Sequence, residues 1–192
     1  MSGPTVGLWL FEPIGFGEIL TEVVPWLERF CEPVETTASG ALDFRVRDGA
    51  AVGLPAMDPD GVGPFLLARD EEVAAPDEDY SAFSRPPVRG LVLCAACSGP
   101  ANHLLLGHLT RALAERLGAW IDFDGLLTCT TPGDDTDEEA LLVRARALTA
   151  SLPGRVEEVW YDTWGGERWL RHVGDVEFLA AWLRHPAFHL IK

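Results

Sequence analysis

The sequence predicts an α+β fold: one domain over residues 1–192, with helices packed on a mainly antiparallel sheet of about six to eight strands. The first sign is a run from Gly90 to Thr110 without a single charged side chain, in a chain of formal net charge -15. Burying an unpaired charge is costly, so an uncharged run of this length is expected to lie in the interior. The second sign is a Gly165-Gly166 pair between two strand-like segments, which is typical of an antiparallel hairpin.

The uncharged run predicts a central unit of strand, helix and strand. Leu91–Cys94 is continuously apolar, which suits a strand buried on both faces. Leucines then recur at intervals of three or four, which marks one face of a helix: Leu106, Leu109, Leu113 and Leu117. Pro100 is placed for the first turn of this helix, Gly118 ends it, and Ala119–Phe123 alternates as a strand. The break at Ser98-Gly99-Pro100 argues against one membrane-spanning helix, although the run is long enough for one.

Two strands and a helix are expected before this unit. Thr5–Phe11 is an apolar segment typical of a strand. From Phe16, apolar side chains fall at helical spacing as far as Phe30, and Pro25 within that stripe predicts a kink in one helix. Leu42–Arg47 alternates as a strand with one face in water.

Residues 50–87 form the irregular part of the chain and are predicted to be an acidic insertion. Six prolines interrupt it, and Asp70–Asp79 is rich in carboxylates. One further strand is expected at Phe65–Ala68. A loop this long is either functional or mobile, and the sequence leaves that choice open.

Three elements are expected after the central unit. Thr136 and Glu139 form a capping box that predicts a helix. A hairpin then spans Arg155–Val173, and Asp175 caps a short helix. Ala187–Ile191 is expected as a last strand.

The hairpin carries the predicted partner-binding surface. A two-residue turn at Gly165-Gly166 would place Trp160 opposite Arg171 and Asp162 opposite Trp169. Three tryptophans then share one face with an aspartate and an arginine: Trp160, Asp162, Trp164, Trp169 and Arg171. Tryptophan and arginine are the side chains that most often anchor protein interfaces. The sequence leaves open whether residues 50–87 cover this face.

Acidity restricts the class of partner. The chain has 30 acidic and 15 basic residues, with a pI of about 4.6. Phosphate binding needs basic surface, so neither nucleic acid nor an anionic membrane is expected as a partner. An acidic surface steers a basic protein instead, and acidity that serves only solubility is the alternative. Four cysteines and the lack of a secretory signal indicate reduced thiols and a cytoplasmic location.

The alternative to a binding protein is a thiol- or metal-dependent enzyme that uses Cys94, Cys97, His103 and Asp122. Cys94 and Cys97 have the spacing of a ligand pair, but they end a strand instead of opening a helix, which favours structural cysteines. A zinc site that adds His103 would lack a second such pair. Asp122 and Asp124 point to one side of a strand as candidate paired carboxylates, although an aspartate before glycine is more often a turn residue. We expect no metal and no cofactor.

Two segments resemble a family of actinobacterial proteins described only as a domain of unknown function. They are GHLTRALAERLGAWIDFDG, which starts at Gly107, and GGERWLRHVGDVEFLAAWLRHPAFHLIK, which ends at Lys192. The resemblance covers most of the chain from Gly7 onward and implies no activity and no functional residue. In general character the chain is also similar to small immunity proteins of bacterial toxin systems, which are acidic, cytosolic and α+β.

These features together predict a non-enzymatic protein-binding protein, as a monomer or a homodimer, whose partner is a basic protein. An immunity protein that occludes a bacterial toxin is the specific form of this hypothesis.

Overall fold

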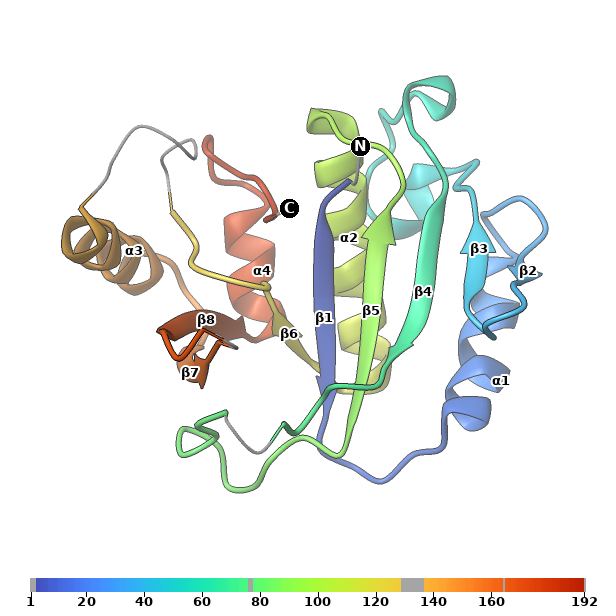
Figure 1. The fold of residues 1–192 in the computed structure, drawn as a ribbon. Helices are drawn as coiled ribbons and strands as arrows, with labels where there is room; N and C mark the ends of the chain where they lie inside the picture. The colour runs from blue at the N-terminus through green and yellow to red at the C-terminus, as the bar shows by residue number, and fades with distance from the viewer. Residues whose placement is uncertain (1–2, 76–77, 129–136, 164, 192) are drawn as a thin grey trace.

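The computed structural model describes residues 3–75, 78–128, 137–163 and 165–191, and these form an eight-stranded sheet with four α-helices (Figure 1). Neighbouring strands are antiparallel throughout, in the order β2-β3-β4-β5-β1-β6-β8-β7. The strands are β1 Thr5–Leu10, β2 Glu35–Thr36, β3 Leu42–Phe44, β4 Phe65–Asp70, β5 Arg89–Ala95, β6 Trp120–Asp122, β7 Val156–Asp162 and β8 Arg168–Gly174. The helices are α1 Phe16–Leu27, α2 Pro100–Leu117, α3 Glu138–Ser151 and α4 Val176–Trp182. The predicted α+β class is confirmed.

The central unit is confirmed as β5, α2 and β6. β1 lies between its two strands and pairs with both, so that Leu8 is opposite Leu91 on one side and Ile121 on the other. Because both strands are antiparallel to β1, they run in the same direction, and α2 is the crossover between them. Gly118 ends α2 with φ 63°, a left-handed conformation that favours glycine. None of the helices in the described ranges has both the length and the apolar character needed to cross a membrane.

One face of the sheet, which we call the helix face, is covered by helices. β1 contributes Val6, Leu8 and Leu10 to it, all of them buried. The helices pack apolar side chains against these residues: Ile19, Val23 and Leu27 of α1, Leu106, Leu109 and Leu113 of α2, and Phe178, Leu179 and Trp182 of α4. In Figure 1, α2 lies directly behind β1 and β5. Burial of this much apolar surface makes the helix face the main source of stability.

The opposite face, which we call the strap face, is covered in part by one loop segment. We call this segment the strap; it comprises residues 71–75 and 78–88. Its apolar side chains Val73, Tyr80 and Phe83 pack on a second, smaller core of Trp9, Val159 and Val173. The ring centroids of Trp9 and Tyr80 are 5.5 Å apart. The second half of the predicted insertion is therefore a covering layer, while the first half includes β4, which confirms the strand expected there.

The hairpin of β7 and β8 forms as expected, but its predicted register is wrong by one residue. Asp162 pairs with Arg168, so residues 163–167 connect the two strands. The turn explains this shift: the N–H of Gly166 donates to the carbonyl of Thr163 at 2.8 Å, and Gly166 has φ 77°. The glycines are therefore the third and fourth residues of this turn and not its two central residues. Because side chains alternate between the two faces of a strand, a shift of one residue changes which side chains of β7 and β8 share a face.

In the observed register, the residues of the predicted tryptophan face lie on opposite faces of the sheet. Trp160 is opposite Leu170 on the helix face, whereas Trp169 is opposite Tyr161 on the strap face together with Arg171. Trp164 lies outside the described residues. The prediction that these tryptophans share one face with Arg171 is therefore wrong for Trp160.

Two predicted element ends also differ from the structure. α1 contains Pro25, as expected, but ends at Leu27 and not near Phe30, because the next residues form tighter i→i+3 bonds: the N–H of Arg29 donates to the carbonyl of Trp26, and that of Phe30 to the carbonyl of Leu27. Ala187–Ile191 is not a strand, although the N–H of Thr5 donates to the carbonyl of Ile191.

The helix caps follow the expected chemistry. Asp175 accepts the N–H of Phe178 at 2.8 Å and caps α4, as predicted. Asp137 caps α3 by accepting the N–H of Glu139. The predicted cap Thr136 lies outside the described residues.

Candidate functional site

A pocket of about 370 Å³ opens on the strap face between the strap and the hairpin. Its floor consists of β1 and β5, and its walls are the start of the strap, the end of β6 and the tip of the hairpin. We call it the acidic pocket because six carboxylates and one arginine line it: Asp70, Glu72, Glu78, Asp122, Asp124, Asp162 and Arg171. These residues come from segments far apart in the chain, and the order of the strands in the sheet brings them together.

Arg171 is the centre of the charge network in this pocket. Its Nη1 donates to Oδ2 of Asp122 at 3.0 Å, and its Nη2 lies 3.0 Å from Oε1 of Glu78. Its guanidinium carbon is 4.3 Å from the ring centroid of Tyr161. The side chains of Arg171, Glu78 and Asp122 are only 19%, 9% and 6% exposed. Arg171 therefore joins β8, β6 and the strap through largely desolvated charges, which are costly to leave unpaired.

Asp122 lies deepest in the network. Burial raises the pKa of Asp122 to about 6, and the charge of Arg171 opposes that rise. While Oδ2 of Asp122 accepts from Arg171, its second oxygen Oδ1 accepts the N–H of Asp124 at 2.9 Å. Opposite Asp122 on β1 is Gly7, where a Cβ atom would come within 3.0 Å of the Asp122 Cβ. A glycine at this position therefore leaves room for the buried carboxylate.

The strap closes the pocket along the edge strand β7. Glu78 forms an antiparallel bridge with Tyr161, and the N–H of Asp79 donates to the carbonyl of Trp160 at 2.8 Å. The second oxygen of Glu78 accepts the hydroxyl of Tyr80. These contacts hold the strap against the hairpin. They also provide hydrogen-bond partners for part of the edge strand β7, whose backbone groups would otherwise be unpaired.

The predicted partner-binding residues are divided between two locations. Asp162 and Arg171 line the acidic pocket. Trp169 is 55% exposed, and it lies opposite Tyr161, which also lines the pocket. Trp160 is half-buried on the helix face, where the guanidinium of Arg168 lies 5.6 Å from its ring centroid. Trp169 and Arg171 thus lie on the strap face as predicted. Asp162 shares the face of Trp160 by register, and it reaches the pocket because it lies at the end of β7.

The residues of the alternative enzyme hypothesis are not gathered at one site. Cys94 is half-buried on β5, where burial raises the pKa of its thiol, and Cys97 is exposed. His103 belongs to α2 on the helix face, where its Nδ1 accepts the N–H of Leu190 at 3.0 Å, whereas Asp122 lies on the strap face. The sheet therefore separates the histidine from the aspartate. In the part of the chain that the structure describes, no group of three or more His, Cys, Asp or Glu residues could hold a metal ion.

His172, the neighbour of Arg171 on β8, is a buried histidine on the helix face. Its Nδ1 accepts the N–H of Leu127 at 3.1 Å, so the proton of a neutral ring lies on Nε2. Burial lowers the pKa of His172 to about 4. Successive residues of one strand thus carry a permanent charge on one face and a neutral ring on the other.

The acidic pocket is suited to binding a cation. Arg171 compensates the buried pair Asp122 and Glu78, whereas the mouth carries the exposed carboxylates Glu72, Asp124 and Asp162. Several carboxylates around one concave surface attract an ammonium or guanidinium group over a long range. Glu78 belongs to the acidic segment Asp70–Asp79, but no local pattern singles it out, because the strap has no regular period. Asp122 and Arg171 could have been paired from the strands that carry them.

In comparisons with known proteins, no curated protein and no solved structure matches the chain. A protein-family model described as a family of unknown function, DUF6368, matches residues 2–192. The chain therefore belongs to this family, DUF6368.

Proposed function

We propose that this chain is a non-enzymatic protein-binding protein and that it acts as an immunity protein by occluding a basic bacterial toxin. The observation that supports this most directly is the acidic pocket beside an exposed tryptophan. The exposed carboxylates Glu72, Asp124 and Asp162 attract a lysine or arginine side chain of the partner, and Trp169 provides an apolar anchor next to it.

The rest of the chain supports the same proposal. A formal net charge of -15 gives the whole surface an attraction for a basic partner. The network of Arg171, Asp122 and Glu78 holds the pocket walls in place before the partner arrives, which reduces the ordering cost of binding. Trp160 is no longer assigned to the binding surface, because it lies on the helix face.

The decisive experiment is a protection assay with the products of the genes that flank the gene of this chain. We expect one flanking product to stop bacterial growth and co-expression of this chain to restore it. The triple variant Glu72→Gln, Asp124→Asn, Asp162→Asn should lose this protection, because it removes the charges at the mouth of the pocket. The proposal fails if no flanking product is toxic or if the triple variant protects as well as the unsubstituted chain.

A matched control separates the pocket from net charge alone. The variant Glu28→Gln, Glu32→Gln, Glu35→Gln changes the net charge by the same amount at exposed positions outside the pocket. It should retain full protection. Light scattering of the isolated chain at the same time distinguishes a monomer from a homodimer that pairs its own Trp169 regions.

A further inference from the structure

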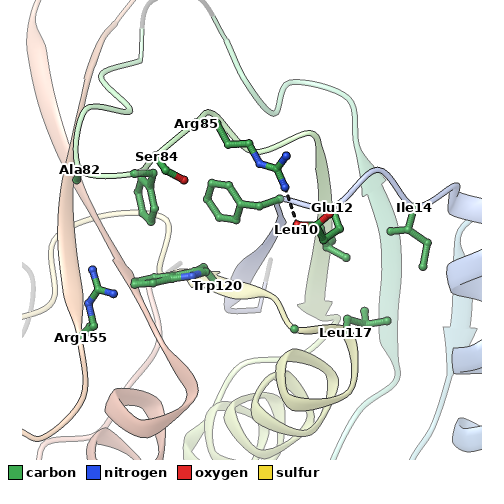
Figure 2. A pocket seen from close by; sticks show the side chains of 12 residues that line it. Leu10, Glu12, Ile14, Ala82, Ser84, Arg85, Leu117, Trp120 and Arg155 are labelled. Atoms are coloured by element: carbon green, nitrogen blue, oxygen red, sulfur yellow. Dashed lines mark hydrogen bonds and ion pairs between the residues drawn. The ribbon is translucent and has the colours of Figure 1, made fainter.

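We propose that a second pocket, at the other end of the strap, binds a small molecule with a flat aromatic body and one anionic group. This pocket, which we call the aromatic pocket, has a volume of about 550 Å³. It lies between the end of β1, the strap, the C-terminus of α2 and the start of β6, and it shares no residue with the acidic pocket. Figure 2 shows Ser84 and Arg85 on one side of the space and Trp120 and Leu117 on the other. The inference goes beyond the proposed function, because protein binding uses the acidic pocket.

Aromatic rings form a continuous wall of this pocket. The centroids of Phe83 and Trp120 are 5.2 Å apart at an interplanar angle of 89°, and Phe11 stacks on Phe83 at 5.2 Å. Trp120 and Phe11 are half-buried, so their rings are held by packing and still reach the pocket. Aromatic rings favour offset-stacked or edge-to-face contacts with another ring, which suits a flat ligand. The volume is within the range of about 300–1,000 Å³ that is usual for small-molecule sites.

The charge of this pocket is opposite to that of the chain as a whole. Two arginines and one glutamate line it, in a chain of formal net charge -15: Arg85, Arg155 and Glu12. Nη2 of Arg85 is 2.6 Å from Oε1 of Glu12, and the two side chains are 48% and 84% exposed. The guanidinium carbon of Arg155 lies 5.2 Å from the ring centroid of Trp120, and this side chain is 66% exposed.

Both guanidinium groups form ion pairs whose carboxylate a ligand anion can replace: Arg85 pairs with Glu12, and Nη2 of Arg155 donates to Oε1 of Glu157 at 2.9 Å. Exposed ion pairs such as Arg85 with Glu12 contribute little to stability, so a ligand can replace the carboxylate without a large cost. A guanidinium binds a carboxylate, sulfonate or phosphate through two parallel hydrogen bonds. One anionic group beside one flat ring therefore matches the arrangement of two arginines beside Trp120.

The experiment uses two probes that differ by one sulfonate group. Anilinonaphthalene sulfonate carries a flat naphthalene ring and an anionic sulfonate, and phenylnaphthylamine is the uncharged compound without the sulfonate. Calorimetric and fluorescence titration of the native full-length chain should give one sulfonate probe per chain, with an affinity at least about tenfold above that of the uncharged probe. Equal affinities for the two probes, or uptake that does not saturate at one equivalent, would overturn the proposal.

Variants of the two arginines locate the binding site. Arg85→Gln with Arg155→Gln should weaken the sulfonate probe by about tenfold or more and leave the uncharged probe unchanged. The control Arg111→Gln removes an arginine of similar exposure on α2 and should change neither affinity. Trp120→Leu, checked for folding by circular dichroism, should weaken both probes. A double arginine variant that binds the sulfonate as tightly as the unsubstituted chain contradicts the assignment.

Discussion

The two faces of one sheet differ in what covers them and in what they contain. The helix face is packed against four helices and buries aliphatic side chains from every part of the chain. The strap face is covered by a loop segment, and its small core is centred on Trp9, Val159 and Val173. Both pockets described above border the strap, and the buried ion network of Arg171 lies under it.

The helix face therefore carries most of the stability, and we propose that binding takes place on the opposite side of the same strands. A dry, interdigitated layer is sensitive to any change in volume, so it tolerates few polar groups. A loop cover leaves gaps at its two ends, where polar side chains reach water and a ligand. Each of the four predictions below tests one part of this division.

The largest effect is expected from a truncation on the helix face. Leu93→Ala removes a fully buried side chain from a central strand and should lower the free energy of unfolding by about 4 kcal/mol. Val92→Ala, one residue away on the half-buried strap face, should cost about 1 kcal/mol or less. Urea unfolding of both variants measures the difference. Equal costs would mean that the strap face is packed as tightly as the helix face.

The next effect concerns the buried charges of the strap face. Arg171→Met leaves Asp122 and Glu78 without their cation and should lower the free energy of unfolding by about 3 kcal/mol at neutral pH. The loss should be smaller in mild acid, because Asp122 already has a raised pKa and can take up a proton. The double variant Arg171→Met, Asp122→Asn should recover part of the stability. Additive losses in the double variant would argue that the two side chains act independently.

The third prediction compares the pH dependence of the two faces. His172 has a pKa of about 4 in the folded chain against an ordinary value of 6.5, so the unfolded chain binds more protons between these values and stability is lost as the pH falls. Asp122, with its raised pKa, acts in the opposite direction and loses stability as the pH rises. His172→Gln should therefore remove about 2.5 kcal/mol from the gain in unfolding free energy between about pH 4.5 and about pH 7.5. An unchanged difference between the two pH values would show that His172 can be protonated in the folded chain.

The smallest effect on stability is expected at the hairpin tip. Trp169→Ala removes an exposed ring and should change the free energy of unfolding by no more than about 0.5 kcal/mol. The same variant should lose protection in the growth assay, because we propose that the ring anchors the complex. Thermal unfolding and the growth assay together measure both properties. A variant that unfolds readily would place this ring in the core and remove it from the binding surface.

Much of the fold could be predicted because local patterns repeat along the sequence. The charge-free run from Gly90 to Thr110 indicated a buried strand and helix, and the alternation in Ala119–Phe123 indicated the strand that follows. The cap at Asp175 was also predicted correctly, because one side chain and a nearby N–H are sufficient for it. The register of the hairpin was not, because a Gly-Gly pair fits more than one turn and a shift of one residue reverses the faces.

The candidate site could be predicted only in part. Asp162, Trp169 and Arg171 were selected from the sequence for their residue types, whereas their position beside the acidic pocket depends on β6, β8 and the strap meeting on one face. Local periodicity and charge thus determine the strands, the helices and the acidic character of this chain, because they act between near neighbours. The order of the strands and the path of the strap decide which charges are buried together, because those contacts join residues as distant as Glu78 and Arg171 and no local pattern records them.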